Sequence, residues 1–212
     1  MNETVKIVSK RFPDVTLKTI SGHFATPNSH VNTYVDMTTM KARLSEAQNA
    51  ARALATEYLS TTIVDTIVCL EGTQVIGSFL ADELTKAGIQ SLNAHKTIYI
   101  TTPENDGIGQ MFFRDNNKMM INGKNVLILL ASATTGKTLS QAISCVRYYG
   151  GTVSGISAIF SAASKVENIP VNYLFSKSDI PDYAAYSPDN CPMCKSGQKI
   201  DALCNGFGFS LL

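Results

Sequence analysis

Strand-like and helix-like segments alternate along the chain from about residue 40 onward. Runs of β-branched and other apolar residues predict strands, and apolar residues at helical spacing predict helices. This alternation is typical of a mostly parallel sheet with helices on both faces, because a parallel connection needs a long crossover. Strands are expected at 63–70, 96–102, 126–130, 152–160 and 171–175, and helices at 40–60, 73–87 and 138–149.

The flanking segments do not continue this alternation. Residues 1–40 and 176–212 are rich in Pro, Ser, Asn and Asp. A chain of 212 residues fits one sizeable domain. We therefore expect a single α/β domain over residues 1–212, in which residues 41–175 form the core. The flanking segments are expected to form a small hood over the crevice at the carboxyl ends of the strands.

The overall composition excludes several classes of protein. The chain has 44% apolar and 17% charged residues, which is typical of a protein with a packed core. Its formal net charge of +1 gives no electrostatic basis for nucleic acid as the main partner. No apolar run is long enough to span a bilayer, and the start of the chain does not read as a signal peptide. We therefore expect a cytoplasmic protein that does not interact with membranes.

The segment NVLILLASATTGKT, which begins at Asn125, joins an apolar strand to a helix through a small, hydroxyl-rich turn. The N–H groups of such a turn lack internal partners, and the helix dipole adds partial positive charge, so the turn suits an anion, most often phosphate. The hydroxyls, the close backbone approach and a cation come from Thr134, Thr135, Gly136, Lys137 and Thr138. The simpler alternative is an ordinary strand-to-helix turn with a polar cap.

The same turn nearly matches the nucleotide-binding P-loop pattern G-x-x-x-x-G-K-[ST]. Ala131 stands in place of the first glycine, which opens the turn in a true P-loop. A P-loop also usually follows the first strand of its domain, whereas this turn follows at least two predicted strands. We therefore interpret the match as accidental.

A second comparison fits the turn better. The segment resembles the ribose-phosphate signature of type I phosphoribosyltransferases, in which an apolar run and two acidic residues precede Thr-Thr-Gly-x-Thr. Residues 65–77 resemble the strand and loop that hold the pyrophosphate of phosphoribosyl pyrophosphate. The loop would consist of Glu71, Gly72, Thr73 and Gln74. Residues 21–24, 34–36 and 191–197 resemble segments of orotate phosphoribosyltransferases, and the order of the pieces fits that branch best.

The resemblance implies a phosphoribosyltransferase-like, Rossmann-like fold and phosphoribosyl transfer to a nitrogenous base, orotate first, in nucleotide metabolism and pyrimidine biosynthesis. It implies phosphoribosyl pyrophosphate or a nucleotide and a small-molecule base as partners, Mg²⁺ as a cofactor, and a homodimer. It assigns the 5′-phosphate to residues 134–138 and the basic groups of the catalytic loop to Arg114 and Lys118.

The departures from this family pattern concern the catalytic groups. Leu130 and Ala131 occupy the two acidic positions, whose carboxylates in the family bind the ribose hydroxyls and help to place Mg²⁺. Loss of two charge-assisted hydrogen bonds would weaken binding by about 3–6 kcal/mol. The pyrophosphate loop has Thr73 and Gln74 where glycines are usual, and the catalytic loop is short. The sequence therefore leaves open whether the chain is an enzyme, and the alternative is a non-catalytic regulatory protein that binds a nucleotide or phosphoribosyl pyrophosphate.

The spacing of Cys191 and Cys194 is that of a pair of metal ligands. A structural zinc needs four ligands, and this motif supplies two. Further candidates are Cys204, His23, His30 and His95. Because nothing in the sequence brings these residues together, a packed tail with two thiols is the simpler interpretation, and no metal ligand is assigned.

Overall fold

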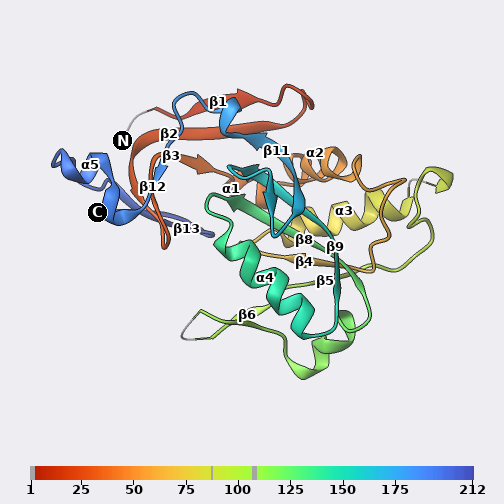
Figure 1. Cartoon of the computed structure of the whole chain (residues 1–212). Coiled ribbons are helices and arrows are strands. Elements are labelled where there is room, and N and C mark those ends of the chain that lie inside the picture. Colours follow the sequence, from red (N-terminus) through yellow and green to blue (C-terminus); the bar gives the residue numbers. More distant parts are fainter. Residues whose placement is uncertain (1–2, 87, 107–108) are drawn as a thin grey trace.

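A six-stranded sheet forms the centre of the computed structural model, which describes residues 3–86, 88–106 and 109–212 (Figure 1). In spatial order its strands are β10 (Lys165–Val166), β11 (Ile169–Ser176), β9 (Thr152–Ser161), β8 (Asn125–Ala133), β4 (Thr66–Cys69) and β5 (Tyr99–Thr101). Every neighbouring pair is parallel except β10 with β11. Read from the β5 edge and numbered by their order in the chain, the five parallel strands β5, β4, β8, β9 and β11 have the order 2-1-3-4-5. The strand order therefore reverses between β4 and β8.

The predicted mostly parallel sheet with covering helices is confirmed, with differences at the ends of elements. The strand expected at 126–130 continues to Ala133, because Ser132 and Ala133 still pair with Phe160 and Ser161 of β9. The helix expected over 40–60 is divided into α1 (Thr38–Ala42) and α2 (Leu44–Ala55), because Arg43 has an extended backbone. Residue 87, the expected end of the next helix, lies outside the described residues.

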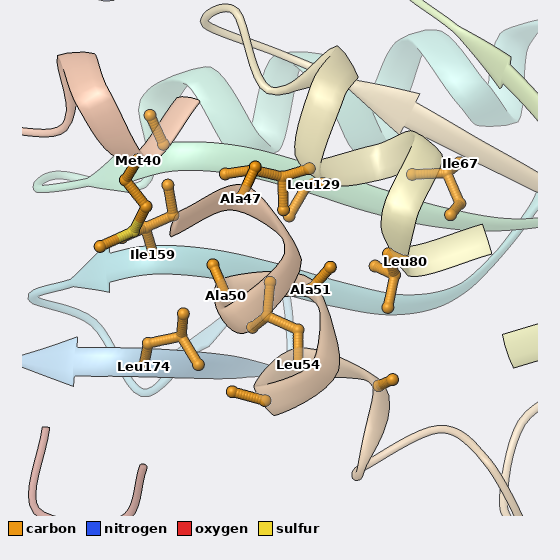
Figure 2. Close-up of a cluster of buried hydrophobic side chains, with 14 of the residues drawn as sticks. Met40, Ala47, Ala50, Ala51, Leu54, Ile67, Leu80, Leu129, Ile159 and Leu174 are labelled. Atoms are coloured by element: carbon orange, nitrogen blue, oxygen red, sulfur yellow. The ribbon is translucent and has the colours of Figure 1, made fainter. Parts of the chain in front are cut away.

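Two helices cover one face of this sheet. They are α2 and α3 (Gln74–Lys86), and their buried residues belong to one cluster with side chains of β4 and β8. Figure 2 shows Ala47, Ala50, Ala51 and Leu54 of α2 against the strands that carry Leu129, Ile159 and Leu174. The alanines are fully buried, and their small side chains allow the helix to lie close to the sheet.

The opposite face is covered by α4 (Lys137–Tyr148). Its buried residues Leu139, Ala142, Ile143 and Val146 share a second cluster with Val126, Ile128 and Leu130 of β8. Successive residues of β8 therefore pack against different helix layers, as the period of a strand requires. Both faces of β8 are buried from Val126 to Ala131, which explains why these residues are all apolar.

A second sheet, which we call the hood, is built from both ends of the chain. Its main path is β12 (Ala185–Tyr186), β3 (His30–Asp36), β2 (Thr16–Ala25), β13 (Ala202–Asn205) and β14 (Gly208–Leu211), and β1 (Val5–Val8) pairs with β2. Strand β13 lies parallel to β2 although the two are far apart in sequence. The flanking segments thus form a sheet of their own, which the sequence did not predict.

Shorter elements complete the described chain. They are α5 (Pro192–Lys195), β6 (Glu104–Asn105), β7 (Met111–Phe112) and the 3₁₀ helices η1 (Gly88–Gln90), η2 (Asp115–Met120), η3 (Lys177–Asp179) and η4 (Pro188–Asn190). No helix in the described residues has both the length and the apolar character that a membrane span requires.

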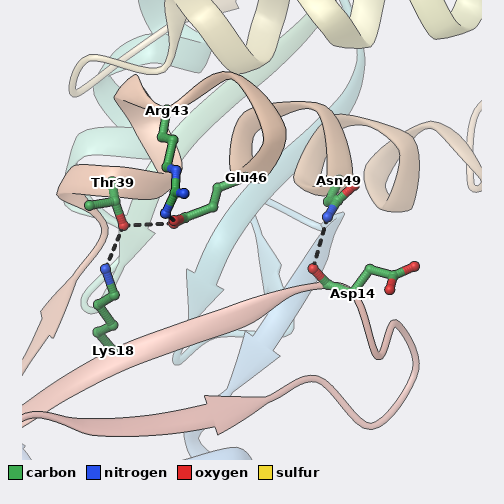
Figure 3. Close-up of polar contacts among 6 residues, drawn as sticks. All are labelled: Asp14, Lys18, Thr39, Arg43, Glu46 and Asn49. Carbon is green, nitrogen blue, oxygen red and sulfur yellow. Dashed lines mark hydrogen bonds and ion pairs between the residues drawn. The ribbon is translucent and has the colours of Figure 1, made fainter.

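Polar contacts fasten the hood to the core (Figure 3). Lys18 of β2 donates to the hydroxyl of Thr39 at 2.7 Å, and that hydroxyl donates to the Glu46 carboxylate at 2.6 Å. Nearby, the side-chain amide of Asn49 donates to the carbonyl of Asp14 at 3.1 Å. These bonds join β2, and Asp14 before it, to α1 and α2, so the hood is held over one end of the central sheet.

The packing of α2 predicts a large difference between two leucines of the same helix. Leu54 is fully buried, whereas Leu44 is 63% exposed. We expect Leu54→Ala to lower the free energy of unfolding by about 2–5 kcal/mol, because it leaves a cavity in the core. Leu44→Ala should change it by less than about 0.5 kcal/mol. Denaturant unfolding of both variants measures the difference, and similar losses in the two would contradict the observed burial.

Candidate functional site

A cavity lies where the carboxyl ends of β4 and β8 meet the hood. Its walls come from four regions: the phosphate turn (134–138) with the end of β8, the loop after β4, α1, and the hood. Residues that line it include Asn28, Tyr34, Lys41, Glu71, Ser132, Thr134, Thr138, Tyr183 and Gly206. Ligands of doubly wound sheets bind at such a reversal of strand order. The topology and the cavity therefore point to the same place.

The phosphate turn (134–138) begins one residue after β8 and leads directly into α4. Gly136 has a φ of 78°, in the left-handed region, and precedes the first residue of the helix. In the part of the chain that the structure describes, no acceptor is found for the backbone N–H groups of Thr134, Thr135, Gly136, Thr138 and Leu139. Free N–H groups at a helix N-terminus form a ready anion site. All five predicted phosphate-binding residues line the cavity.

Glu71 lies beside the end of β8. One of its carboxylate oxygens, Oε2, accepts the backbone N–H of Ser132 at 3.0 Å. Its φ of 56° is unusual for a residue other than glycine. Burial raises the pKa of Glu71 despite this hydrogen bond and the neighbouring Lys41. A strained backbone and a raised carboxyl pKa in one cavity-lining residue are typical of functional sites.

Lys41 is a site residue that the sequence analysis missed. Its ammonium donates to the carbonyl oxygens of Glu71, at 3.0 Å, and Gly206, at 2.6 Å. Burial lowers the pKa of Lys41, although Glu71 and Asp36 oppose the shift. The lysine therefore joins the loop after β4 to the turn between β13 and β14. No local motif marks it, because its role depends on where α1 meets the crevice.

The rest of the predicted pyrophosphate loop does not line the cavity. Thr73 is fully buried, and its hydroxyl donates to the carbonyls of Leu70 and Leu129. Gln74 opens α3 and donates to the hydroxyl of Thr102. Gly72 has a φ of 79° and lies between these residues and Glu71. The loop thus presents one of its four predicted residues, Glu71, to the cavity.

Leu130 and Ala131, at the degenerate acidic positions, are 0% and 4% exposed at the end of β8. Neither side chain can bind a hydroxyl or a cation. Among the described residues that line the cavity, Glu71 is the only carboxylate. Protein-bound Mg²⁺ usually has one or two carboxylates together with phosphate oxygens and water. With one carboxylate, the cavity has the smallest number of such ligands that is usual for protein-bound Mg²⁺.

The structure does not bring Arg114 and Lys118 to this cavity. Arg114 forms a two-bond contact with Glu104, at 2.8 and 2.6 Å, and lies over the ring of Phe112. Lys118 forms an ion pair with Asp115 at 2.6 Å. Both lie in the segment that leads to the amino end of β8, at the other end of the strand from the phosphate turn. A catalytic role for these two residues stays a prediction.

The hood supplies aromatic walls that sequence patterns did not assign. Tyr34 of β3 and Tyr183 line the cavity. Burial, helped by Asp36 and Cys204, raises the pKa of Tyr34 to about 12, so its phenol stays neutral and can donate a hydrogen bond. Flat aromatic side chains with one polar group suit a planar, polar ligand such as a nitrogenous base.

Comparisons with known proteins agree with this arrangement. No family model matches the chain. An orotate phosphoribosyltransferase from Desulforamulus reducens is 27% identical over 182 residues, which covers 84% of this chain and 85% of that protein. Its counterpart from Chlorobium phaeobacteroides is 26% identical over 185 residues, with 86% and 87% covered.

Solved structures show the fold. The UMP synthase of Leishmania donovani superposes with a TM-score of 0.55 and 16% identity, over 76% of this chain and 34% of that one. The orotate phosphoribosyltransferase of Mycobacterium tuberculosis H37Rv gives a TM-score of 0.51 and 14% identity, over 76% and 90%. The chain has the type I phosphoribosyltransferase fold, and the predicted resemblance to the orotate branch is confirmed.

The phosphate turn yields a prediction with a matched control. A Cβ at Gly136 would lie 3.1 Å from Val166, in a backbone that disfavours L side chains. We expect Gly136→Ala to weaken ribose 5-phosphate binding by about tenfold or more, which is about 1.4 kcal/mol. The control is Gly123→Ala, which also puts an L side chain on a residue with positive φ (69°). Gly123 lies near the amino end of β8, and a Cβ there would meet nothing within 4 Å. Calorimetric titration should show normal affinity for that control, and equal losses would contradict the site.

Glu71 yields a prediction about pH. Because its pKa is raised in the folded state, its ionisation opposes folding, and stability is lost as pH rises through the folded pKa. Glu71→Gln removes the ionisation and keeps an acceptor for the Ser132 N–H. We expect the variant to melt higher than the wild type at neutral pH. That difference should shrink toward the ordinary carboxyl pKa of 4.5.

The exposed Glu57 provides the control for this experiment. Glu57→Gln should leave the melting temperature nearly unchanged across the same pH range. If Glu71→Gln destabilises the protein equally at every pH, the charge of Glu71 is not what opposes folding.

Proposed function

We propose that the chain binds phosphoribosyl pyrophosphate and transfers its phosphoribosyl group to a nitrogenous base, with orotate as the first candidate. The observation that carries this proposal is the row of free N–H groups in the phosphate turn, which lines the same cavity as Glu71. The similarity to orotate phosphoribosyltransferases over most of the chain supports the choice of substrate.

The cavity residues have distinct roles in this proposal. The phosphate turn (134–138) binds the 5′-phosphate, and Lys137 adds charge. In the reaction, the bond from C1′ to pyrophosphate breaks and a bond from C1′ to a base nitrogen forms. Positive charge develops on the ribose during this exchange. The carboxylate of Glu71 would stabilise it, and the walls of the hood would hold the base in line.

Glu71 is the residue of the cavity whose carboxylate would hold Mg²⁺. When bound, the ion would neutralise charge on the departing pyrophosphate. Without the acidic pair of the family signature, the protein holds the ribose through fewer groups, so we expect slower transfer than in a protein with both carboxylates.

A non-catalytic regulatory protein is the second candidate. Two observations favour it: the acidic positions are occupied by the buried Leu130 and Ala131, and Arg114 is paired with Glu104. In this alternative, the phosphate turn binds a nucleotide or phosphoribosyl pyrophosphate, and no phosphoribosyl group is transferred.

We also propose a homodimer. Arg114 and Lys118 are remote from the cavity of their own chain, so they can act on phosphoribosyl pyrophosphate only from a neighbouring subunit. This proposal rests on the resemblance, and the particle mass in solution tests it.

One assay separates the two functions. We expect pyrophosphate release when the protein is mixed with phosphoribosyl pyrophosphate, orotate and Mg²⁺. We expect Gly136→Ala to lower this release strongly and Gly123→Ala to retain it. In parallel, phosphoribosyl pyrophosphate at about 100 times its Kd should stabilise the protein by about 2.7 kcal/mol. Stabilisation without pyrophosphate release would favour the regulatory protein, and the absence of both would contradict the two candidates together.

A further inference from the structure

Four metal-ligating side chains meet at the edge of the hood, away from the phosphate turn. They are His23, His30, Cys191 and Cys194, and their ligand atoms all lie within 4.8 Å of one another. Nε2 of His23 is 3.1 Å from Nδ1 of His30, 3.5 Å from the sulfur of Cys191 and 3.6 Å from the sulfur of Cys194. The sulfur of Cys194 is also 3.2 Å from Nδ1 of His30. The four atoms therefore surround one point.

These separations are those of a tetrahedral zinc site. Zinc bonds of 2.0–2.1 Å to nitrogen and 2.3 Å to sulfur place two nitrogens about 3.3 Å apart, and a nitrogen and a sulfur about 3.5 Å apart. The four separations given above agree with these values to within a few tenths of an ångström, and the other two pairs of ligand atoms lie within 4.8 Å. We propose that His23, His30, Cys191 and Cys194 bind a structural zinc ion.

The surroundings of His23 fit this role. Its Nδ1 lies 3.0 Å from the carbonyl oxygen of Gln198, which can only accept, so Nδ1 carries the proton. Nε2 then has a lone pair, and the atoms around it are the two sulfurs and Nδ1 of His30. A ligand histidine held through its other nitrogen by a backbone carbonyl is the usual arrangement at zinc sites. His23 is fully buried, and its backbone N–H donates to Asp201 at 2.7 Å, so the ring is fixed in place.

The four ligands come from opposite ends of the chain. His23 lies in β2 and His30 begins β3, whereas Cys191 precedes α5 and Cys194 lies in it. Cys191 is the N-cap residue of α5, and the three-residue spacing brings its thiol to the same side as that of Cys194. Both cysteines are free thiols. An ion at this point would join the N-terminal hairpin to the C-terminal segment, a connection that closes a loop of more than 160 residues.

Zinc fits this donor set better than other metals. Two thiolates and two imidazoles form a common structural zinc site with no open position, whereas Mg²⁺ and Ca²⁺ prefer oxygen ligands. The ion has no part in the proposed transfer reaction. Its effect is on the hood, because residues 26–28, between the two histidines, line the cavity, and so do residues 204–206, which follow the cysteines. Zinc would therefore fix the shape of the hood side of the cavity.

Metal analysis of the full-length protein, purified under reducing conditions, tests the proposal. We expect inductively coupled plasma mass spectrometry to find one zinc ion per chain. Added Co²⁺ in the metal-free protein should give the visible absorption of a tetrahedral cobalt–thiolate site. Removal of zinc by a chelator should lower the melting temperature, and Zn²⁺ alone should restore it. This readout does not depend on transfer activity, so it can fail while the proposed function holds, and the reverse.

Variants identify the ligands. We expect Cys194→Ser and His30→Asn to lose most of the bound zinc. The control Cys145→Ser, in α4 and outside the cluster, should keep it. If the ligand variants fail to fold, the chelator experiment on the wild type still decides. The proposal is overturned if the folded, reduced wild type contains no zinc and binds neither Zn²⁺ nor Co²⁺. It is also overturned if the isolated protein carries a Cys191–Cys194 disulfide in place of metal.

Discussion

The burial of β8 on both faces is the constraint on which the rest of the structure depends. Its residues from Val126 to Ala131 are between 0% and 4% exposed, so water can reach the strand only at its ends. The pairing with β4 and β9 fixes where its carboxyl end lies. Gly136 then reverses the chain into α4. The free N–H groups of the turn at 134–138 are a consequence of this geometry, because the turn lies directly after the carboxyl end of β8, where the chain leaves the sheet.

The site joins this rigid core to a hood made from both termini. Glu71 accepts from the end of β8, and Lys41 bonds to the carbonyls of Glu71 and Gly206. A single chain of contacts therefore runs from the central sheet through the loop after β4 to the C-terminal hairpin. A change in the hood would reach the cavity through these bonds, which gives the proposed zinc ion a route by which it supports ligand binding without touching the ligand.

The loss of the acidic pair and the retention of the turn have different physical consequences. The turn acts through backbone N–H groups, which survive substitution as long as the backbone keeps its path. In the family pattern the acidic pair acts through side chains, and the apolar side chains of Leu130 and Ala131 can form neither of its contacts. Among the described residues that line the cavity, Glu71 is the carboxylate that remains, and burial raises its pKa although Lys41 and the Ser132 N–H oppose the shift.

Sequence alone determined the central sheet and the position of the turn at 134–138, because both are local; the binding of phosphate by this turn stays a prediction. An apolar run such as 126–130 predicts a buried strand, and the helical pattern that follows predicts a turn between this strand and the helix. Only the tertiary structure decided the hood, the role of Lys41 and the meeting of His23 and His30 with Cys191 and Cys194. Those contacts join residues more than 160 positions apart, or depend on where α1 lies relative to the cavity. No periodicity in the sequence records such a distance, since it is set by the packing of the whole chain.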